Sequence, residues 1–179
     1  ANIKQWKAQN RQELQVSINT SPSHYFNLES NITQWLNLLL DQKISARSIL
    51  LEVTENLLME ANEMVSKKLF QFRQAGVDIA LDDFGTGYSS ISYLKRFPTD
   101  FIKIDRSFVK SMTDVSNDKV LCEAIIVMAN KLGIKVVAEG VETQEQYDIL
   151  KSMGCDYAQG YFIAKPLSKS DFESFWERH

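Results

Sequence analysis

Short apolar stretches alternate with longer amphipathic ones along the chain. Six stretches have the period-two or β-branched pattern of strands, and they cover residues 14–19, 49–53, 77–81, 101–104, 134–138 and 157–159. Apolar residues between them recur with helical spacing, which predicts helices over residues 22–41, 62–74, 90–95, 118–132, 143–153 and 168–178. Residues 1–10 are expected to hold the end of a helix. Strands and helices alternate at intervals of roughly 25 to 35 residues, as in parallel βα units.

Four residues predict where helices begin or end. Gly76, Gly133 and Gly154 follow the periodic stretches directly and are typical C-terminal stops. Thr143 precedes a helical stretch and has Gln146 three residues later, the pattern of a capping box. The alternation of elements therefore rests on boundary signals as well as on periodicity.

Successive side chains of a strand point to opposite faces, so each predicted strand carries two sets. One set is apolar, with Ile18, Leu51 and Ile102 as examples. The other set includes a polar residue at or near the C-terminal end of each strand; these residues are Asn19, Glu52, Asp82, Lys103, Glu139 and Gln159. In a βα barrel this second set points inward, at the end where such barrels hold their active sites.

An inward cluster of three carboxylates, one ammonium and two amides needs compensation, because burying unpaired charge is costly. A bound divalent metal would supply it. The alternative is that each residue is a solvated strand end, which suits any one of them better than all six. An open doubly wound sheet is a second alternative, but no glycine-rich phosphate loop follows the first strand. We therefore predict a TIM-type βα barrel that is incomplete, with about six of the eight strands.

Two adjacent carboxylates, Asp82 and Asp83, stand where the third strand stops and a glycine-bearing loop begins at Gly85. Adjacent residues of a strand point to opposite faces, so the two carboxylates can reach different ligands and the pair can serve two cations. Hard divalent cations need such oxygen ligands. The alternative is an Asp pair that caps a turn or a helix.

The composition excludes several classes of protein. The chain has 179 residues, 44% of them hydrophobic and 24% charged, which suits one soluble core, and no Pro/Gly/Ser linker divides it, so a single domain over 1–179 is predicted. Its net charge of -3 gives no reason to expect binding to a nucleic-acid polymer. No stretch suits a bilayer span or a signal peptide, so no direct membrane contact is expected.

The two cysteines and two histidines limit the metal chemistry. Cys122 and Cys155 have neither metal-ligand spacing nor a disulfide framework, so a reducing, cytoplasmic compartment is expected. With only His24 and His179 present, both expected at the surface, a multi-histidine metal site is excluded. Any metal here must rely on carboxylates.

Five motifs in order along nearly the whole chain closely resemble the EAL-domain family of cyclic di-GMP phosphodiesterases. They are Glu-Val-Thr-Glu at 52–55, Asp-Asp-Phe-Gly-Thr-Gly-Tyr-Ser-Ser at 82–90, Ile-Lys-Ile-Asp at 102–105, Val-Ala-Glu-Gly-Val-Glu at 137–142 and Gln-Gly-Tyr at 159–161. The resemblance implies a modified TIM barrel that uses two Mg²⁺ or Mn²⁺ ions and hydrolyses cyclic di-GMP to linear pGpG in bacterial signalling.

The resemblance also implies roles for single residues. The implied metal ligands are Asn19, Glu52, Asp82, Asp83 and Glu139, and the implied catalytic positions are Lys103, Glu139, Gln159 and Glu55. Lys103 would lie near the nucleophilic water, Gln159 would orient water or metal, and Glu55 would anchor the loop after Asp83. The alternative for Lys103 is a buried salt bridge, and Asp105 is interpreted as a supporting partner of the site.

One departure concerns the Glu-Ala-Leu motif that names the family, which is absent because the chain begins after it. We therefore expect the C-terminal three-quarters of an EAL domain, without one metal ligand, and weak or no catalysis by this chain alone. A non-hydrolysing cyclic di-GMP receptor is the alternative function. Exposed sheet edges predict a homodimer or higher association. The sequence leaves open the upstream domains and the membrane attachment of a parent protein.

Overall fold

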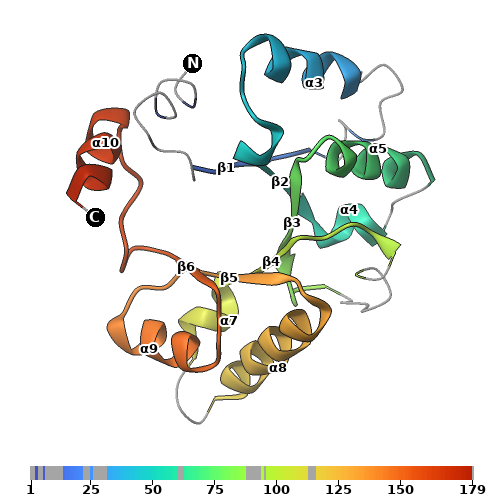
Figure 1. Ribbon diagram of the computed structural model, residues 1–179. Coiled ribbons are helices and arrows are strands. Elements are labelled where there is room, and N and C mark those ends of the chain that lie inside the picture. The colour runs from blue at the N-terminus through green and yellow to red at the C-terminus, as the bar shows by residue number, and fades with distance from the viewer. Residues whose placement is uncertain are drawn as a thin grey trace. The chain divides into compact units, whose positions relative to one another are not determined.

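The computed structural model describes residues 3, 6, 14–21, 25, 32–59, 63–87, 94, 96–112 and 116–178. The chain divides into two compact units, Ala1–Lys103 and Ile104–His179. Each unit is a run of strands and helices in alternation (Figure 1). The single EAL domain over 1–179 stays a prediction.

The first unit contains a parallel sheet with helices packed on it. Its elements are β1 (Val16–Asn19), α3 (Ile32–Asp41), a 3-10 turn (Ala46–Ser48), β2 (Ile49–Thr54), α4 (Glu55–Met59), α5 (Glu63–Gln74), β3 (Asp78–Phe84) and β4 (Phe101–Ile104), whose last residue begins the second unit. The strands lie in chain order, β1-β2-β3-β4. Leu51 of β2 is aligned with Ile18 of β1 and with Ile79 of β3, both in parallel.

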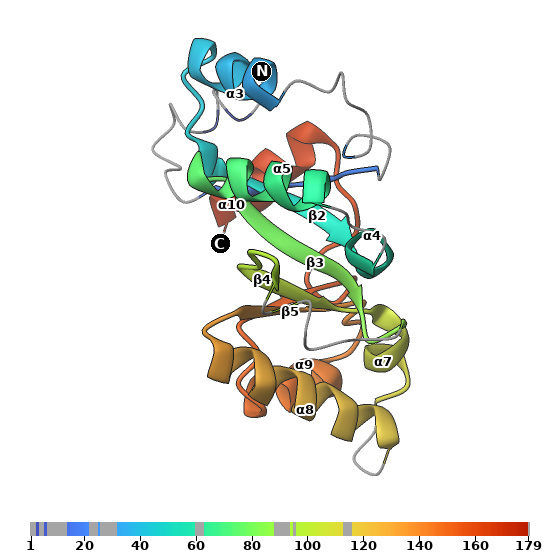
Figure 2. The same cartoon turned by 90° about the vertical axis from the view of Figure 1, so that its right-hand side faces the viewer.

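The second unit begins with the end of β4 and repeats the same alternation. It contains α7 (Arg106–Lys110), α8 (Asn117–Leu132), β5 (Lys135–Glu139), α9 (Gln144–Ser152), β6 (Tyr157–Gln159) and α10 (Lys169–Arg178). β5 and β6 are parallel, and α8 and α9 lie on the same side of β5 (Figures 1 and 2). In the described ranges, no helix has the length and apolar character that a bilayer span needs.

All six predicted strands are present, and β3 extends three residues beyond its predicted end, to Phe84. The helices predicted over 62–74, 118–132, 143–153 and 168–178 are all found, and no end differs from its predicted position by more than one residue. α4 and α7, with five residues each, were not predicted. The helices expected at 1–10, at 90–95 and in the first part of 22–41 fall mostly outside the described residues.

The predicted boundary signals are confirmed. Gly76 and Gly133 have φ of 91° and 72°, the left-handed conformation that ends a helix. The hydroxyl of Thr143 accepts a hydrogen bond from the Gln146 amide, while the Gln146 side chain accepts from the Thr143 amide. This capping box satisfies donors that the first turn of α9 would otherwise leave open.

The apolar set of the first three strands packs against α3 and α5. Leu51 of β2 is buried together with Leu39 of α3, and Ile18 packs against the same cluster. Trp35 of α3 meets Phe72 of α5 edge to face, with ring centroids 5.3 Å apart. This packing fixes one face of the sheet, so the parity of each strand directs the polar set to the other face.

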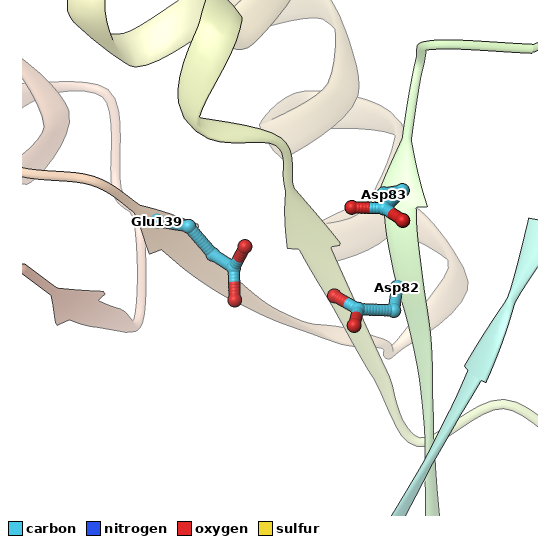
Figure 3. Close-up of side chains that lie close together, drawn as sticks. All are labelled: Asp82, Asp83 and Glu139. Atoms are coloured by element: carbon cyan, nitrogen blue, oxygen red, sulfur yellow. The ribbon is translucent and has the colours of Figure 1, made fainter. Parts of the chain in front are cut away.

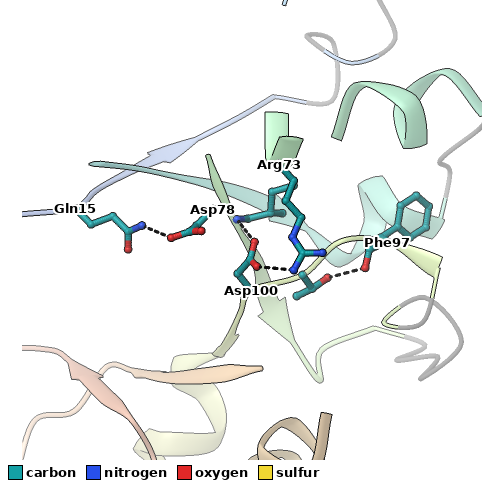
Figure 4. A network of polar contacts seen from close by, with 7 residues as sticks. Gln15, Arg73, Asp78, Phe97 and Asp100 are labelled. Carbon is teal, nitrogen blue, oxygen red and sulfur yellow. Dashed lines mark hydrogen bonds and ion pairs between the residues drawn. The ribbon is translucent and has the colours of Figure 1, made fainter. Parts of the chain in front are cut away.

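Polar contacts tie the starts of the strands together in the first unit (Figure 4). Gln15 donates to Asp78 Oδ2 at 2.7 Å, next to the start of β3. Asp100, just before β4, accepts from the Ile79 amide at 3.0 Å and pairs with Arg73 at 3.0 Å. Because half of the Arg73 side chain is exposed, we assign register to the backbone contact rather than to the ion pair.

In the second unit, the turn after β6 packs directly on the backbone that follows β5. The Val141 amide donates to Gln159 O at 3.1 Å, and the Phe162 amide donates to Val141 O at 3.0 Å. A Cβ on Gly160 would lie 2.1 Å from the carbonyl oxygen of Val141. The glycine of the 159–161 motif is therefore required by this close approach.

We expect Gly160→Ala to lower the free energy of unfolding by about 3 kcal/mol or more, the upper end of overpacking costs, because a rigid backbone atom occupies the space of the new methyl group. The control is Gly133→Ala, where φ is positive but nothing lies within 4 Å of the added Cβ. That change should cost only about 1 kcal/mol. Urea denaturation of both variants measures the difference, and equal losses would contradict the packing argument.

Candidate metal centre

Three charged side chains of the first unit meet inside the polar face of its sheet. The Lys103 ammonium of β4 lies 2.9 Å from Glu52 Oε1 of β2 and 3.0 Å from Asp82 Oδ1 of β3. Glu52 is aligned with Ala80, two residues before Asp82, so the two acids share one face of the sheet. We call Glu52, Asp82 and Lys103 the buried trio. The predicted inward set of the first unit is therefore partly confirmed.

The trio is nearly closed to solvent. The side chains of Glu52, Lys103 and Asp82 are 5%, 6% and 14% exposed. Charges at this depth are costly unless they are paired, and one ammonium between two carboxylates leaves one negative charge uncompensated. The salt bridge considered as an alternative role for Lys103 is thus present, and it leaves the site acidic.

One oxygen of the trio is only partly satisfied. Asp82 Oδ1 is shielded from solvent, and in the described part of the chain no donor addresses it with hydrogen-bond geometry. Lys103 Nζ lies 3.0 Å from the same atom, so the contact is an ion pair by distance and not a directed hydrogen bond. The contact therefore compensates charge but leaves Asp82 Oδ1 without a hydrogen-bond donor in the described part of the chain. This oxygen therefore keeps a lone pair suited to a cation.

The backbone turns sharply at the acidic pair. Asp83 has φ of 56°, in the left-handed region that costs a residue with a Cβ roughly 1–2 kcal/mol. Its carbonyl accepts from both the amide and the hydroxyl of Thr86, which holds the turn. A carboxylate oxygen of Asp83 lies within 4.8 Å of one of Asp82, and both side chains are seen at the end of β3 in Figure 3.

This geometry corrects the expectation that Asp82 and Asp83 point to opposite faces of a strand. Regular alternation requires extended φ, and the positive φ of Asp83 ends it. The two carboxylates are instead close neighbours with different exposure, Asp82 half-buried and Asp83 exposed. Such a pair offers oxygen ligands at two depths, which suits one cation or two neighbouring cations.

Two further predicted residues lie in the same unit as the trio. Asn19 ends β1 directly opposite Glu52 in the parallel register, and it is exposed. Glu55 begins α4 and is only 4% exposed. A Cβ on Gly87 would lie 3.2 Å from the Glu55 carboxyl carbon, so this carboxylate lies against the loop that follows Asp83. Glu55 can anchor the loop after Asp83 only if its carboxylate lies against that loop, as it does here. That Glu55 has this role stays a prediction.

The second unit contains the other two predicted residues. Glu139 ends β5 and Gln159 ends β6, and the parallel register aligns them with each other. Glu139 is half-buried and Gln159 exposed, and Figure 3 draws the Glu139 side chain at the end of its strand. The two side chains thus end neighbouring strands, as the strand pattern predicted.

Asp105 has a capping role that was not predicted, and its role as a supporting partner of the site stays a prediction. Its carboxylate accepts hydrogen bonds from the amide and hydroxyl of Ser107, which makes it the N-cap of α7. Partial burial raises the pKa of Asp105, but the hydrogen bonds from Ser107 outweigh it and hold this pKa below its usual 3.8. Asp105 at the start of Asp-Arg-Ser 105–107 is a residue type typical of N-caps, but it was assigned to the alternation of the preceding strand.

The donor set fits a hard divalent cation. In the first unit, the oxygens of Asn19, Glu52, Asp82 and Asp83 are the ligand type that Mg²⁺ and Mn²⁺ prefer. Glu139 of the second unit offers a carboxylate of the same type. In the described part of the chain, neither thiol joins a group of possible metal ligands. Burial also raises the pKa of Cys122 to about 12 and that of Cys155 to about 11. Both cysteines are free, and both histidines lie outside the described residues.

The chain matches the EAL domain family over residues 1–166. It is 46% identical over 125 residues to the cyclic di-GMP phosphodiesterase NbdA of Pseudomonas aeruginosa. The aligned residues make up 70% of this chain and 16% of NbdA. The chain spans between 16 and 30% of the lengths of the curated relatives that it matches. With this match the chain belongs to the EAL domain family.

Solved structures agree with the assignment. The EAL domain of DcpA from Mycobacterium smegmatis superimposes with a TM-score of 0.90 at 32% identity, over 99% of this chain and 80% of that one. A manganese and cyclic di-GMP complex of BlrP1 from Klebsiella pneumoniae superimposes with a TM-score of 0.81 at 32% identity. The match covers 92% of this chain and 42% of the BlrP1 chain. The predicted fold class, an incomplete TIM-type βα barrel of the EAL family, is therefore confirmed.

We expect Lys103→Met to lower the free energy of unfolding of the metal-free protein by roughly 3–5 kcal/mol, because it leaves two buried carboxylates without their cation. Mn²⁺ should then raise the melting temperature more in the variant than in the wild type, since the ion takes over the compensation. Thermal melts with Mn²⁺ and with chelator measure both effects.

The control for this variant is Lys67→Met, which removes an exposed ammonium from α5 with the same change of side chain. It should change neither the melting temperature nor its response to Mn²⁺. An equal response of the two variants to Mn²⁺ would show that the trio does not bind the ion.

Proposed function

We propose that this domain is a metal-dependent phosphodiesterase that hydrolyses cyclic di-GMP to linear pGpG. The main support is the buried trio, which leaves an acidic, partly unsatisfied site beside Asp83 at the strand ends. Membership of the EAL domain family adds to it, because relatives such as NbdA are named cyclic di-GMP phosphodiesterases. The BlrP1 complex supports both a divalent cation and this ligand.

The proposed ligands of Mg²⁺ or Mn²⁺ are Asn19, Glu52, Asp82, Asp83 and Glu139. Bound cations of this kind lower the pKa of water and stabilise the charge that develops on a phosphoryl group. Glu52 and Asp82 hold the Lys103 ammonium in place at 2.9 and 3.0 Å. This fixed positive charge can stabilise the phosphoryl oxygens without reorganisation.

The remaining proposed catalytic residues position groups around this centre. Gln159 presents an amide that can orient a water molecule through one donor and one acceptor. Glu139 is proposed to contact the metal or its water. Glu55 holds the loop after Asp83 through its contact with Gly87, which keeps the second Asp in place.

The decisive experiment compares cyclic di-GMP hydrolysis by this chain and by a version extended at its N-terminus, with Mg²⁺, with Mn²⁺ and with chelator. We expect the extended protein to produce pGpG only with a divalent cation, and the shorter chain to be weak or inactive. Chromatography of the nucleotides measures both. Efficient turnover in the presence of chelator would refute metal dependence.

In the extended protein, Asp83→Asn should reduce turnover by about 100-fold or more, since even residues that only support a metal ligand cost roughly 10–100-fold. The matched control is Asp118→Asn, which makes the same change at a half-buried carboxylate in the first turn of α8. Nucleotide binding without hydrolysis by the unmodified extended protein would instead favour the second candidate, a cyclic di-GMP receptor. An Asp83→Asn variant as active as the control would remove Asp83 from the proposed site.

We propose that the domain associates as a homodimer or larger assembly, because a partial barrel presents open strand edges that pair readily. Light scattering measures this, and a monodisperse monomer would contradict it. We also propose a cytoplasmic location, in keeping with the two free cysteines.

A further inference from the structure

Three residues outside the proposed ligand set form a continuous hydrogen-bonded connection to Glu52. The amide and the hydroxyl of Thr20 both donate to the Glu52 carbonyl, at 3.1 and 2.8 Å. The Tyr25 hydroxyl lies 3.0 Å from Thr20 Oγ1. The Lys68 ammonium of α5 donates to the Tyr25 carbonyl at 3.0 Å. The connection therefore runs from α5 to the C-terminal end of β2.

The direction of these hydrogen bonds follows from proton counts. Thr20 has one hydroxyl proton, and the Glu52 carbonyl can only accept, so that proton is committed to Glu52. Tyr25 must then donate to Thr20 Oγ1. Burial raises the pKa of the Tyr25 phenol above its usual 10, so the phenol remains a donor throughout the neutral range.

The connection fixes the backbone of Glu52, while a separate contact fixes its carboxylate. The carbonyl of Glu52 is held by Thr20, and its carboxylate is held by Lys103. With both ends fixed, the direction of the side chain is set. Asn19 immediately precedes Thr20 and is aligned with Glu52, so the same contacts set the position of two proposed ligands.

Burial makes the connection rigid. Tyr25 is 2% exposed and Lys68 is 9% exposed, and ordering a lysine at this depth is justified only by specific contacts. Thr20, Tyr25 and Lys68 also line a cavity of about 880 Å³. Because this cavity offers space, removing a hydroxyl should not force the neighbours to collapse, and the hydrogen bond itself contributes only about 0.5–1.5 kcal/mol.

We propose that Thr20 and Tyr25, anchored by Lys68, are positioning residues that hold Glu52 and Asn19 in the geometry for binding a divalent cation. The proposal rests on the proposed metal-dependent function. A small misplacement of a ligand costs far more in metal binding or rate than the hydrogen bond contributes to stability. The effect on the metal should therefore exceed the effect on folding.

The test uses Thr20→Val, which keeps the shape but removes the hydroxyl, Thr20→Ser, which keeps the hydroxyl, and Tyr25→Phe, all in the N-terminally extended protein. Mn²⁺ affinity is measured directly by electron paramagnetic resonance of the free ion, independently of turnover. Thr20→Val and Tyr25→Phe should weaken Mn²⁺ binding by about 10-fold, the usual effect of losing a residue that supports a metal ligand. Thr20→Ser should restore most of the affinity.

Two further readouts separate positioning from general destabilisation. At saturating Mn²⁺ the KM for cyclic di-GMP should stay unchanged, because no substrate contact is removed. The double variant Thr20→Val/Tyr25→Phe should bind Mn²⁺ no more weakly than Thr20→Val alone, since both act through one connection. Thr99→Val is the control, because it removes a hydroxyl that donates to Phe97 O at 3.5 Å beside the start of β4 (Figure 4).

The outcomes distinguish the two proposals. If the unmodified protein neither binds Mn²⁺ nor turns over cyclic di-GMP with it, the proposed function fails. If it does both, and Thr20→Val and Tyr25→Phe bind Mn²⁺ as tightly as Thr99→Val, the positioning role is overturned. A loss of melting temperature in Thr20→Val with unchanged Mn²⁺ affinity also overturns it, because the hydroxyl would then serve folding alone.

Discussion

The contact of one ammonium with two buried carboxylates determines much of the polar face in the first unit. Lys103 comes from β4, and its partners Glu52 and Asp82 come from β2 and β3. Without this internal cation, two carboxylates at this depth would repel each other and oppose the pairing of their strands. The ammonium allows the strands to pair when no metal is bound. Because it carries one positive charge against two negative ones, the site keeps a net negative charge that would favour a divalent cation.

The shared face of Glu52 and Asp82 and the ends of α8 and α9 could be predicted from the sequence because they depend on local signals. Period two directs Glu52 and Asp82 to one face, and Gly133 and Thr143 set helix ends through backbone conformation and capping. The resemblance to the EAL family supplied the roles, and the strand parity supplied an independent reason for the same positions. At Lys103 the resemblance and the strand parity agree, and the structure places its ammonium between Glu52 and Asp82.

The features that could not be predicted depend on contacts distant in sequence or on single backbone angles. Lys68 lies on the buried stripe of α5 between Val65 and Leu69, but a lysine there is expected to extend its ammonium to solvent, so its contact with the Tyr25 carbonyl could not be predicted. The positive φ of Asp83 is a compromise between strand and turn that periodicity does not encode. α7 was missed because its cap, Asp105, directly follows a strand and continues the strand's alternation.

The same backbone angle gives the acidic pair its chemical character. In an extended strand Asp83 would face away from Asp82, and the pair would divide its charge between two faces of the sheet. The left-handed turn, held by Thr86 and bordered by the Glu55 contact at Gly87, brings both carboxylates to the end of β3. The conformational cost of roughly 1–2 kcal/mol at a residue with a Cβ is then offset by contacts in the folded loop. Since a cation would gain from the resulting charge density, the strain at Asp83 and the proposed affinity for a hard ion would have one structural cause.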